Sequence, residues 1–506
     1  KKDKKILLYL LMNSLKKKYY SGSKFKKSIS KKTLDVVNPS NLKILGSIAI
    51  QNKKEVNQVV TDLKKEQYKW RKLSTLERSK ELHNIANQID NSNLKELART
   101  MSKEVGKPIT EAYGEIANVS SAIRYFAEMA RNEGGNIAGA TQSESLQMET
   151  KEPIGISAHI LPFNFPILIM IWTVAASLAA GNAVIIKPSE QATFTSLIFM
   201  KFFDQLSAKV VSCMTGDATT GKAIIDHKDV NIVSFTGSAE TAKKVYQSCA
   251  ENFKPCHLEG GGSDYMIISD KTDIDFAAAA AITSSFHLSG QICTSTEHIL
   301  VHNKIYDRFK KVLLKKLNAL RVGDGLKKIE IGPLATIATF NKAKNIISDA
   351  AEKGALITYH KDKRRIDSLK GYFSCPAIIE NTKSNMLCEK DEMFAPFITM
   401  EPYSKITEAI KKVNKSKFGL GFNIITKDLE EALYVSRNIE AGLVWINNPL
   451  IDNDALPFGG FKKSGIGREL GKMGLDTFRQ TKMVIIDNEQ KKHDWWYPYS
   501  EKQFKT

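Results

Sequence analysis

The feature that most constrains the fold is a change of rhythm near residue 154, where short β-rich runs begin to alternate with helical runs. GISAHI (155–160), AVIIKPSE (183–190) and NIVSFTGS (231–238) are each followed by a helical pattern. Alternating strands and helices predict a parallel sheet whose strands are joined by crossover helices, as in dinucleotide-binding folds. A second alternating block covers about residues 264–446. We therefore expect an α/β protein.

An uncharged run of 17 residues, Phe165–Gly181, lies between two of the predicted strands. It is slightly shorter than the ~20 residues that a membrane-spanning helix needs. Pro166 stands where the first turn of a helix tolerates proline, and Gly181 stands where a helix would end. We therefore predict a helix buried inside the α/β domain, and no transmembrane segment. Residues 75–132 place apolar residues three and four apart and are also predicted to be helical.

Length and composition narrow the class of protein. A chain of 506 residues is expected to form two or three domains. Its 42% hydrophobic and 25% charged residues are typical of a globular protein and argue against a disordered one. The six cysteines form no CxxC pair, which argues against a disulfide framework and a structural zinc site. These thiols favour a reducing compartment.

The net charge of +19 first suggests a nucleic-acid or membrane partner. However, residues 1–32 carry +11 of it, and the other 474 residues carry only +8. Because the excess lies in a terminal segment, we expect no nucleic-acid partner. That segment is basic and nearly free of acids, as organelle leaders are, and an interfacial helix or a disordered extension are the alternatives. Its apolar stretch, Ile6–Met12, is too short to span a bilayer. We expect a cytoplasmic protein, with organelle targeting as the alternative.

Two short motifs close predicted strands at the edge where parallel sheets bind ligands. FTGS (235–238) joins a strand to a helix, and a glycine there lets backbone amides at the helix start approach an anion. An ordinary tight turn would look the same. KPSE (187–190) ends in a carboxylate, Glu190, that can accept both ribose hydroxyls of adenosine and would repel a 2′-phosphate. The alternative is a solvated loop without a ligand.

Two further residues have side chains suited to catalysis. Glu259 precedes three glycines, so its carboxylate can be held in a tight space, although a turn with an incidental acid fits the same spacing. Cys293 follows a glycine turn near a predicted helix start, which would lower its pKa, although most free cysteines are small buried hydrophobes. His287 and His298 flank Cys293 and raise the competing hypothesis of a Cys/His protease. We interpret both histidines as structural.

Taken together, the motifs resemble those of the NAD(P)-dependent aldehyde dehydrogenase superfamily. Seven segments follow the family order over about residues 34–487. They are LPFNFP (161–166), KPSE (187–190), FTGS (235–238), LEGGG (258–262), GQICTS (290–295), EMFAP (392–396) and PFGGFKKSGIGRELG (457–471). The resemblance implies a Rossmann-type cofactor domain, an α/β catalytic domain and a β-arm for oligomerisation.

The resemblance also implies a role for individual residues. Cys293 matches the nucleophile, Glu259 the general base and Asn164 the oxyanion-hole donor. The positions that match cofactor contacts are Phe163, Lys187, Ser189, Glu190, Gly237, Ser238, Glu392 and Phe394. The positions expected to line the aldehyde tunnel are Phe165, Ile169, Trp172, Ile292, Thr294 and Phe458. No metal ligands are implied.

From this resemblance we predict oxidation of an aldehyde to the carboxylate through a cysteine thiohemiacetal and a thioester. Retention of Glu259 predicts that water hydrolyses the thioester. Glu190 favours NAD, with NADP possible. The mostly apolar tunnel positions favour a small or medium aliphatic or aromatic aldehyde, and a semialdehyde-specific enzyme is the close alternative. A non-catalytic or structural protein on the same fold is the other alternative.

The resemblance divides the chain into expected parts. These are a basic extension at 1–33, a dinucleotide-binding domain at 34–133 and 153–259, a catalytic domain at 260–470, an oligomerisation arm at 134–152 and 471–487, and a tail at 488–506. The family arm predicts a homodimer or a homotetramer.

Overall fold

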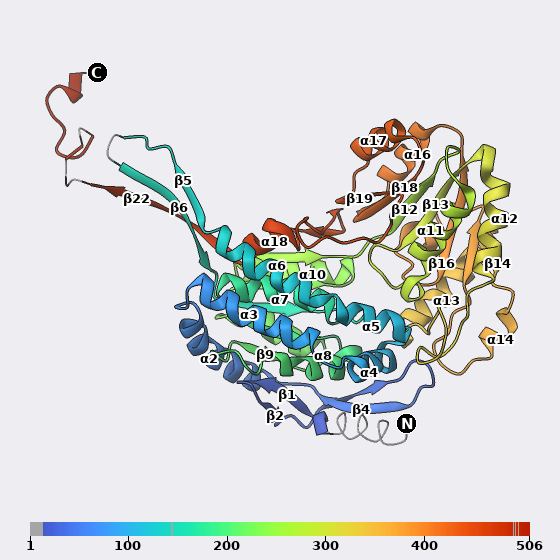
Figure 1. Ribbon diagram of the computed structural model, residues 1–506, viewed down its shortest axis with the longest axis horizontal. Coiled ribbons are helices and arrows are strands. Elements are labelled where there is room, and N and C mark those ends of the chain that lie inside the picture. The colour runs from blue at the N-terminus through green and yellow to red at the C-terminus, as the bar shows by residue number, and fades with distance from the viewer. Residues whose placement is uncertain (1–13, 143–144, 489, 491, 494, 506) are drawn as a thin grey trace.

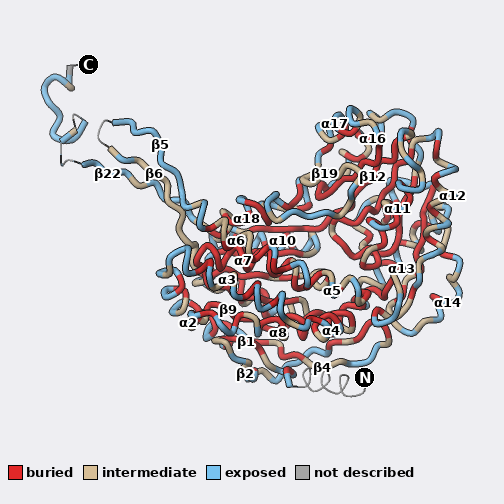
Figure 2. Tube along the Cα trace, viewed as in Figure 1, coloured by how far each residue is buried: buried red, intermediate tan, exposed pale blue. Residues whose placement is uncertain are grey.

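The protein consists of two α/β bodies and a narrow arm (Figure 1). The computed structural model describes residues 14–142, 145–488, 490, 492–493 and 495–505. Each body is built on one large sheet, and the arm projects from the body that contains the N-terminal half of the chain (Figure 1). The buried residues gather around the two sheets, whereas the arm is mostly exposed or half-buried (Figure 2). The predicted apolar stretch at residues 6–12 lies outside the described residues.

The first sheet has eight strands in the order β2-β1-β9-β8-β7-β10-β11-β21. In that order they are Phe25–Lys27, Lys18–Ser21, Val211–Cys213, Ala183–Lys187, Ile156–Ile160, Ile232–Thr236, Cys256–Glu259 and Gly465–Ile466. The five strands from β9 to β11 are parallel. The strands predicted from GISAHI, AVIIKPSE and NIVSFTGS are therefore confirmed as β7, β8 and β10. Their carboxyl ends lie at one edge of the sheet.

Helices cover both faces of this sheet (Figure 1). The predicted helical region contains α3 to α6, and the uncharged run forms α7, Leu168–Ala180, nearly all of which is buried. Gly181 ends α7 with φ of 100°, a left-handed conformation that glycine adopts without strain. Within the described residues, no helix is long and apolar enough to cross a membrane. The helices of this body are α2 (Lys53–Trp70), α3 (Thr75–Asp90), α4 (Lys95–Val105), α5 (Ile109–Ala117), α6 (Val119–Asn132), α7, α8 (Thr193–Phe199), α9 (Ala218–Ile225), α10 (Ala239–Glu251) and α18 (Gly471–Thr477).

The second sheet has seven strands in the order β14-β15-β16-β13-β12-β18-β19. In that order they are Leu356–Tyr359, Ala377–Glu380, Phe397–Tyr403, Thr296–His302, Asp264–Ile268, Gly421–Ile425 and Leu443–Ile446. All neighbours are parallel except β14, which runs antiparallel to β15. Its helices are α11 (Ile274–Phe286), α12 (Tyr306–Leu317), α13 (Ile337–Glu352), α14 (Lys363–Asp367), α15 (Leu387–Lys390), α16 (Ile406–Asn414) and α17 (Leu429–Asn438). The second alternating block of the sequence thus forms a sheet of its own.

The lysine-rich N-terminal segment differs from the predicted separate extension. Strands β1 and β2 lie within it, and β1 joins the first sheet by pairing antiparallel with β9. Tyr19 and Tyr20 are buried although lysines surround them in the sequence, and the Tyr20 hydroxyl donates to Asp204 at 2.7 Å. Burial of these rings holds the segment on the sheet edge. Next along the chain, β3 (Thr33–Val37) and β4 (Ile44–Ala49) form a separate two-stranded sheet.

The arm is a three-stranded antiparallel sheet in the order β22-β6-β5. These strands are Arg479–Asp487, Ser145–Pro153 and Gly135–Ala138. Part of the predicted arm, residues 471–477, instead forms α18, which packs against α6 and α7. The described part of the C-terminal tail continues beyond the arm strands (Figure 1).

The chain returns to the first sheet before it enters the arm. Strand β21 pairs antiparallel with β11, and the two-residue strands β17 (Phe418–Gly419) and β20 (Phe461–Lys462) pair with each other. Phe458 and Leu470 belong to the hydrophobic core of the first body. The segment that contains them thus connects the two bodies beside the carboxyl end of β11.

Candidate active site

Cys293 lies in an irregular turn between α11 and β13, and not at the start of a helix. Two residues of this turn, Leu288 and Ser289, have φ of 48° and 57°, a left-handed conformation that non-glycine residues seldom adopt. The Ser289 hydroxyl donates to the carbonyl of Gly332 at 2.9 Å, and the Ser295 hydroxyl donates to the last turn of α11 at 3.2 Å. The surrounding structure therefore holds a strained backbone next to the predicted nucleophile.

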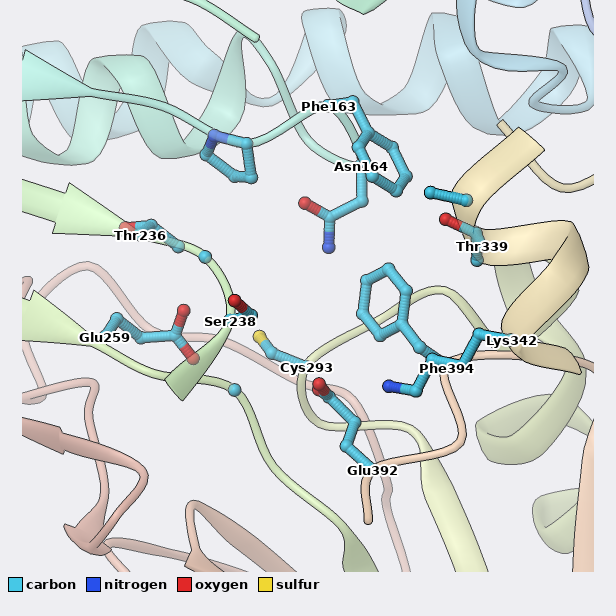
Figure 3. Close-up of a pocket in the computed structure, with 14 residues that line it drawn as sticks. Phe163, Asn164, Thr236, Ser238, Glu259, Cys293, Thr339, Lys342, Glu392 and Phe394 are labelled. Atoms are coloured by element: carbon cyan, nitrogen blue, oxygen red, sulfur yellow. The ribbon is translucent and has the colours of Figure 1, made fainter. Parts of the chain in front are cut away.

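Asn164 follows β7 and is oriented by the cysteine turn. Its Nδ2 donates to the backbone carbonyl of Gln291 at 3.0 Å, and Gln291 Oε1 in turn accepts from the N–H of Ala335 at 2.9 Å. A side-chain amide has two N–H donors, so one remains for a ligand. Figure 3 shows this amide projecting into the same space as the sulfur of Cys293. The geometry allows Asn164 to donate to an oxygen that develops negative charge there.

Glu259 is the last residue of β11, and its carboxylate faces the Cys293 sulfur (Figure 3). Both carboxylate oxygens are buried, and the groups beside them that can donate are the thiol of Cys293 and the backbone N–H of Gly261. Burial raises the pKa of Glu259 well above its usual value, and the carboxylates of Glu469 and Glu392 raise it further. A buried carboxyl group with a raised pKa can take a proton from a ligand, water or thiol beside it.

The predicted lowering of the Cys293 pKa is wrong for this structure. Burial raises the pKa of the thiol well above its usual value, and the nearby carboxylates of Glu259 and Asp264 add to the shift. The prediction assumed a helix start, which is absent from the described turn, and the fold instead places acids around the sulfur. The structure therefore favours a neutral thiol, whose proton must be removed before the sulfur can attack.

Two cavities meet at this point, and they share Thr236, Glu259 and Cys293. The first has a volume of about 260 Å³ and the second about 320 Å³. Among the residues that line the first are the predicted cofactor contacts Phe163, Gly237, Ser238, Glu392 and Phe394. The second is lined by all six predicted substrate contacts, Phe165, Ile169, Trp172, Ile292, Thr294 and Phe458. The sulfur is thus reached from two sides.

The first cavity lies against the start of a helix. Ser238 is the N-cap of α10, and its hydroxyl accepts from the N–H of Thr241 at 3.3 Å. A β-carbon at Gly237 would lie 2.7 Å from the ring of Phe235, so this turn has no room for a side chain. Exposed backbone at the start of a 13-residue helix suits a phosphate group. The FTGS turn therefore fits a dinucleotide.

The opposite wall of the first cavity is formed by the EMFAP turn. Glu392 accepts from the N–H of Gly262 at 3.2 Å, and burial raises its pKa to about 8. Phe394 faces Phe163 edge to face, with ring centroids 6.0 Å apart. The walls of the cavity thus offer a carboxyl group and two aromatic rings (Figure 3).

The KPSE residues lie at the carboxyl end of β8 and do not line either cavity. Lys187 Nζ is 3.0 Å from Glu190 Oε1, and the hydroxyl of Ser189 caps the short helix that begins at Glu190. A cofactor role for these three residues stays a prediction. Their position at the same sheet edge as the FTGS turn is compatible with the far end of an extended ligand.

Glu297 supports the site but is absent from the residues selected by sequence. It is buried, and its Oε1 accepts from the backbone N–H groups of Met393 and Phe394 at 2.6 and 2.7 Å. Its Oε2 accepts from the hydroxyl of Ser263 at 2.9 Å. One carboxylate thus ties the EMFAP turn to the glycine segment that follows Glu259. An acid inside the apolar strand β13 was the signal that could have identified it.

Other lining residues gave no usable signal in the sequence. Thr339 and Lys342 reach the first cavity from the first turns of α13, far along the chain from the motifs (Figure 3). Asp452, which lies outside every motif, lines the second cavity. Glu469 also lines it and stands inside the PFGGFKKSGIGRELG segment, although no role for it was predicted from the sequence. Only the fold brings Thr339, Lys342 and Asp452 to the site.

The Cys/His hypothesis is not supported by the geometry. His298 is buried, accepts or donates to Thr399 and Ser263 at 2.7 and 2.9 Å, and stacks on Tyr265. His287 lines the second cavity, with Nδ1 3.4 Å from a carboxylate oxygen of Glu111. Within the described residues neither histidine is hydrogen-bonded to Cys293. The described part of the chain also contains no cluster suited to a metal ion.

Comparison with known proteins matches this chain to one family over nearly its whole length. The model of the aldehyde dehydrogenase family matches residues 25–484. A mitochondrial succinate-semialdehyde dehydrogenase of Oryza sativa subsp. japonica is 33% identical over 471 residues, which cover 92% of this chain and 89% of the relative. A betaine aldehyde dehydrogenase of Bacillus subtilis is 31% identical over 468 residues, which cover 91% and 96%.

Solved structures match over the same extent. A Staphylococcus aureus betaine aldehyde dehydrogenase in complex with NAD+ superposes with a TM-score of 0.92 at 28% identity, covering 97% of this chain and 99% of the other. An Escherichia coli NADP-dependent enzyme superposes with a TM-score of 0.89 at 31% identity, covering 94% and 99%. The similarity therefore includes both bodies of the molecule.

Proposed function

The chain belongs to the aldehyde dehydrogenase family, and from that premise we propose that Cys293, Glu259 and Asn164 carry the oxidation of an aldehyde to its carboxylate. The protein is an NAD(P)-dependent oxidoreductase. The observation that carries the proposed roles is the junction of the two cavities. A cofactor and an aldehyde can approach the Cys293 sulfur through different cavities without displacing each other.

The proposed reaction begins with the proton of Cys293, which Glu259 faces and can accept. The sulfur then adds to the carbonyl carbon, and the carbonyl oxygen becomes an alkoxide. The free N–H of Asn164 and the backbone N–H of Cys293 donate to that alkoxide. Loss of one such donor typically slows catalysis by about 100–1,000-fold. NAD(P), when bound, supplies the acceptor for the hydride that leaves the carbon.

Hydrolysis completes the cycle. The acyl group is then joined to Cys293 as a thioester, and Glu259 releases the proton of the thiol to solvent. Glu259 next takes a proton from water so that the oxygen attacks the acyl carbon. The carbon–sulfur bond breaks, the carboxylate leaves, and Glu259 returns its proton to the Cys293 sulfur. This sequence requires a soft nucleophile, an uncharged amide donor and an ionisable base, and the junction holds one of each.

The residues present fit the dinucleotide, because the FTGS turn, the start of α10 and the carboxyl groups of Glu259 and Glu392 surround one cavity. Glu392, Phe394, Phe163, Gly237 and Ser238 would hold the nicotinamide end and the phosphates. Lys187, Ser189 and Glu190 would hold the adenosine ribose. NAD is the preferred cofactor, since the Glu190 carboxylate accepts ribose hydroxyls and repels a 2′-phosphate, and the Lys187 ammonium already pairs with it.

The arm supports a homodimer or homotetramer. Its strands expose apolar side chains, including Ile137 and Met483 at 74% and 78% exposure. A surface of this kind is typical of a contact with a second copy.

The test is a panel of neutral aldehydes offered to the purified protein with NAD and with NADP. We expect formation of NADH and of the free acid, and a higher kcat/KM for NAD than for NADP. Cys293→Ala should abolish turnover and still bind NAD in a fluorescence titration. Full turnover by that variant would overturn the mechanism, and lack of turnover by the unchanged protein would favour a non-catalytic role.

A further inference from the structure

The second cavity is lined by more acidic than basic side chains. Three of the residues that line it are acids, namely Glu259, Asp452 and Glu469. Among the described residues that line it, none is a lysine or an arginine. The single histidine, His287, has its pKa lowered to about 4 by burial and is therefore neutral at physiological pH. Desolvation raises the pKa values of these acids, to about 7 for Asp452 and about 8 for Glu469, so a cation beside them would favour their ionised forms. A ligand in this cavity thus meets three carboxyl groups and no fixed positive charge.

Of these three acids, Asp452 is the one whose carboxyl group is available to bind a ligand. Glu259 belongs to the catalytic junction, and Glu469 accepts from the hydroxyl of Thr236 at 3.3 Å. No described residue forms a hydrogen bond or an ion pair with the Asp452 side chain, and that residue is exposed to solvent. Its charge nevertheless raises the pKa values of Cys293 and Glu469, so it lies within electrostatic reach of the reacting sulfur.

The loop that carries Asp452 is held on both sides of this residue. The indole N–H of Trp445 donates to the carbonyl of Ile451 at 2.8 Å. On the other side, the N–H of Gly471 donates to the carbonyl of Asp454 at 2.8 Å, and the side chain of Asp454 is bound by the hydroxyl of Ser121. The carboxylate of Asp452 is thus presented from a fixed backbone, as a preformed partner for a charge would be.

Aromatic rings form the other side of the cavity. Trp172 and Phe458 lie with ring centroids 5.0 Å apart, and Phe165 lines the same space. The faces of such rings attract cations, and quaternary ammonium groups in particular. One face of the Phe165 ring already carries an ammonium group, that of Lys107, at 3.9 Å from the ring centre. Lys107 is buried and paired with Glu115 at 2.5 Å, so it is not available to a substrate.

Positive side chains line a further cavity of about 400 Å³ that adjoins the second at Thr283 and His287. It is lined by Lys327, Lys328 and Arg321, the last of which pairs with Glu330. A short anionic aldehyde bound with its carbonyl at Cys293 would place its carboxylate in the acidic cavity, before this basic one.

Resting on the proposed function, we propose that the second cavity selects aldehydes that carry an ammonium group a few bonds from the carbonyl, with Asp452 as the charge partner. This assigns the substrate class and gives Asp452 a binding role. It also separates this chain from relatives that act on anionic semialdehydes, although the chain is similar to relatives of both kinds.

The test compares aldehydes that differ only in charge. Trimethylammonioacetaldehyde and 3,3-dimethylbutanal have the same shape, because a quaternary nitrogen replaces a quaternary carbon. With the purified protein and NAD, we expect kcat/KM to be about tenfold higher for the cation. Succinate semialdehyde should be a poorer substrate than 4-methylpentanal, which has the same chain length without the charge.

Matched variants assign the effect to one carboxylate. Asp452→Asn should reduce the ratio of the cationic to the neutral kcat/KM by about tenfold and raise the ratio of the anionic to the neutral one. Glu408→Gln, an exposed acid of α16 outside the lining of the cavity, should leave both ratios within about twofold. Turnover of the neutral aldehydes reports independently that each variant is folded and that the proposed function holds.

Two results would overturn the inference. Equal kcat/KM for the cationic and neutral aldehydes, or ratios that Asp452→Asn does not change, would remove Asp452 as the charge partner and leave the proposed function intact. No turnover of any of the four aldehydes would overturn the proposed function, and the inference with it.

Discussion

At the scale of single residues, Glu259 and Cys293 face each other in a site that favours the neutral form of both. Burial and neighbouring acids raise both pKa values. A general base works only when it is deprotonated, so the activity that depends on Glu259 rises as the pH rises through its pKa. The raised pKa of Glu259 moves this rise in activity to higher pH, since a larger part of the population is protonated at any given pH.

Replacement of this carboxylate should therefore separate the two halves of the reaction. In Glu259→Gln we expect acylation still to produce one equivalent of NADH, but more slowly because the thiol must give its proton to solvent, and hydrolysis to slow further, by about 100–10,000-fold, the usual contribution of a general base. Rapid mixing should show the burst, and mass spectrometry should show acyl-enzyme at Cys293. The rising limb of the pH profile for steady-state turnover should also disappear. A variant that hydrolyses its thioester at the normal rate would exclude Glu259 as the base.

The sequence alone was sufficient to select some residues of the site and not others. Cys293, Glu259 and Asn164 stand inside motifs whose order along the chain could be compared with a family pattern. The pKa of Cys293 could not be predicted, because it depends on acids that the fold brings from distant segments. Asp452 lies outside every motif, and its place in the second cavity depends on a loop that Trp445 and Gly471 hold.

At the scale of helices and strands, alternation of strand and helix patterns predicted β7, β8 and β10 well. Those strands are buried on both faces, so their apolar runs are continuous. The short strands β1 and β2 were not predicted, because lysine side chains hide the two buried tyrosines that hold β1 in the sheet. Two-residue strands such as β21 carry no periodic signal at all.

The strand β13 allows a prediction about one supporting carboxylate. Glu297→Ala removes the acceptor for Met393, Phe394 and Ser263, and should loosen the EMFAP turn on the cofactor side. We expect the KM for NAD to rise by about tenfold, as for loss of a buried charge-assisted hydrogen bond, with a smaller change in the KM for the aldehyde. Steady-state kinetics with each substrate varied in turn measures both constants.

The matched control is Glu297→Gln. An amide oxygen can still accept from the two backbone N–H groups, so this variant should recover most of the affinity for NAD. If Glu297→Gln were as impaired as Glu297→Ala, the charge and not the hydrogen-bonded position of the turn would be responsible. Equal increases in both KM values would contradict a role confined to the cofactor side.

At the scale of the whole molecule, the catalytic junction lies between two bodies that the chain crosses more than once. Cys293 comes from the second body, whereas Asn164 and Glu259 come from the first, and the hydrogen bond from Asn164 to Gln291 joins them. The alternating blocks predicted both sheets, but no pattern predicted how the sheets face each other. That arrangement depends on contacts between segments more than a hundred residues apart.

The arm yields a prediction about assembly. Ile137→Asp combined with Met483→Asp places charges on exposed apolar positions of β5 and β22. Because burying an unpaired charge is costly, we expect the mass measured by light scattering to fall from that of a dimer or tetramer toward that of a single chain. Lys482→Ser is the control, since its side chain is already charged and exposed on the same strand. An unchanged mass for the double variant would exclude this surface of the arm from the contact.

The two cavities that share Cys293 have a kinetic consequence. On the proposed assignment, the carboxylic acid and the reduced dinucleotide depart through different openings, so release of one does not have to wait for the other. Product inhibition should reflect this division. The acid should compete with the aldehyde alone, and the reduced dinucleotide with its oxidised form alone, in a molecule whose fold has built two entrances to a single sulfur atom.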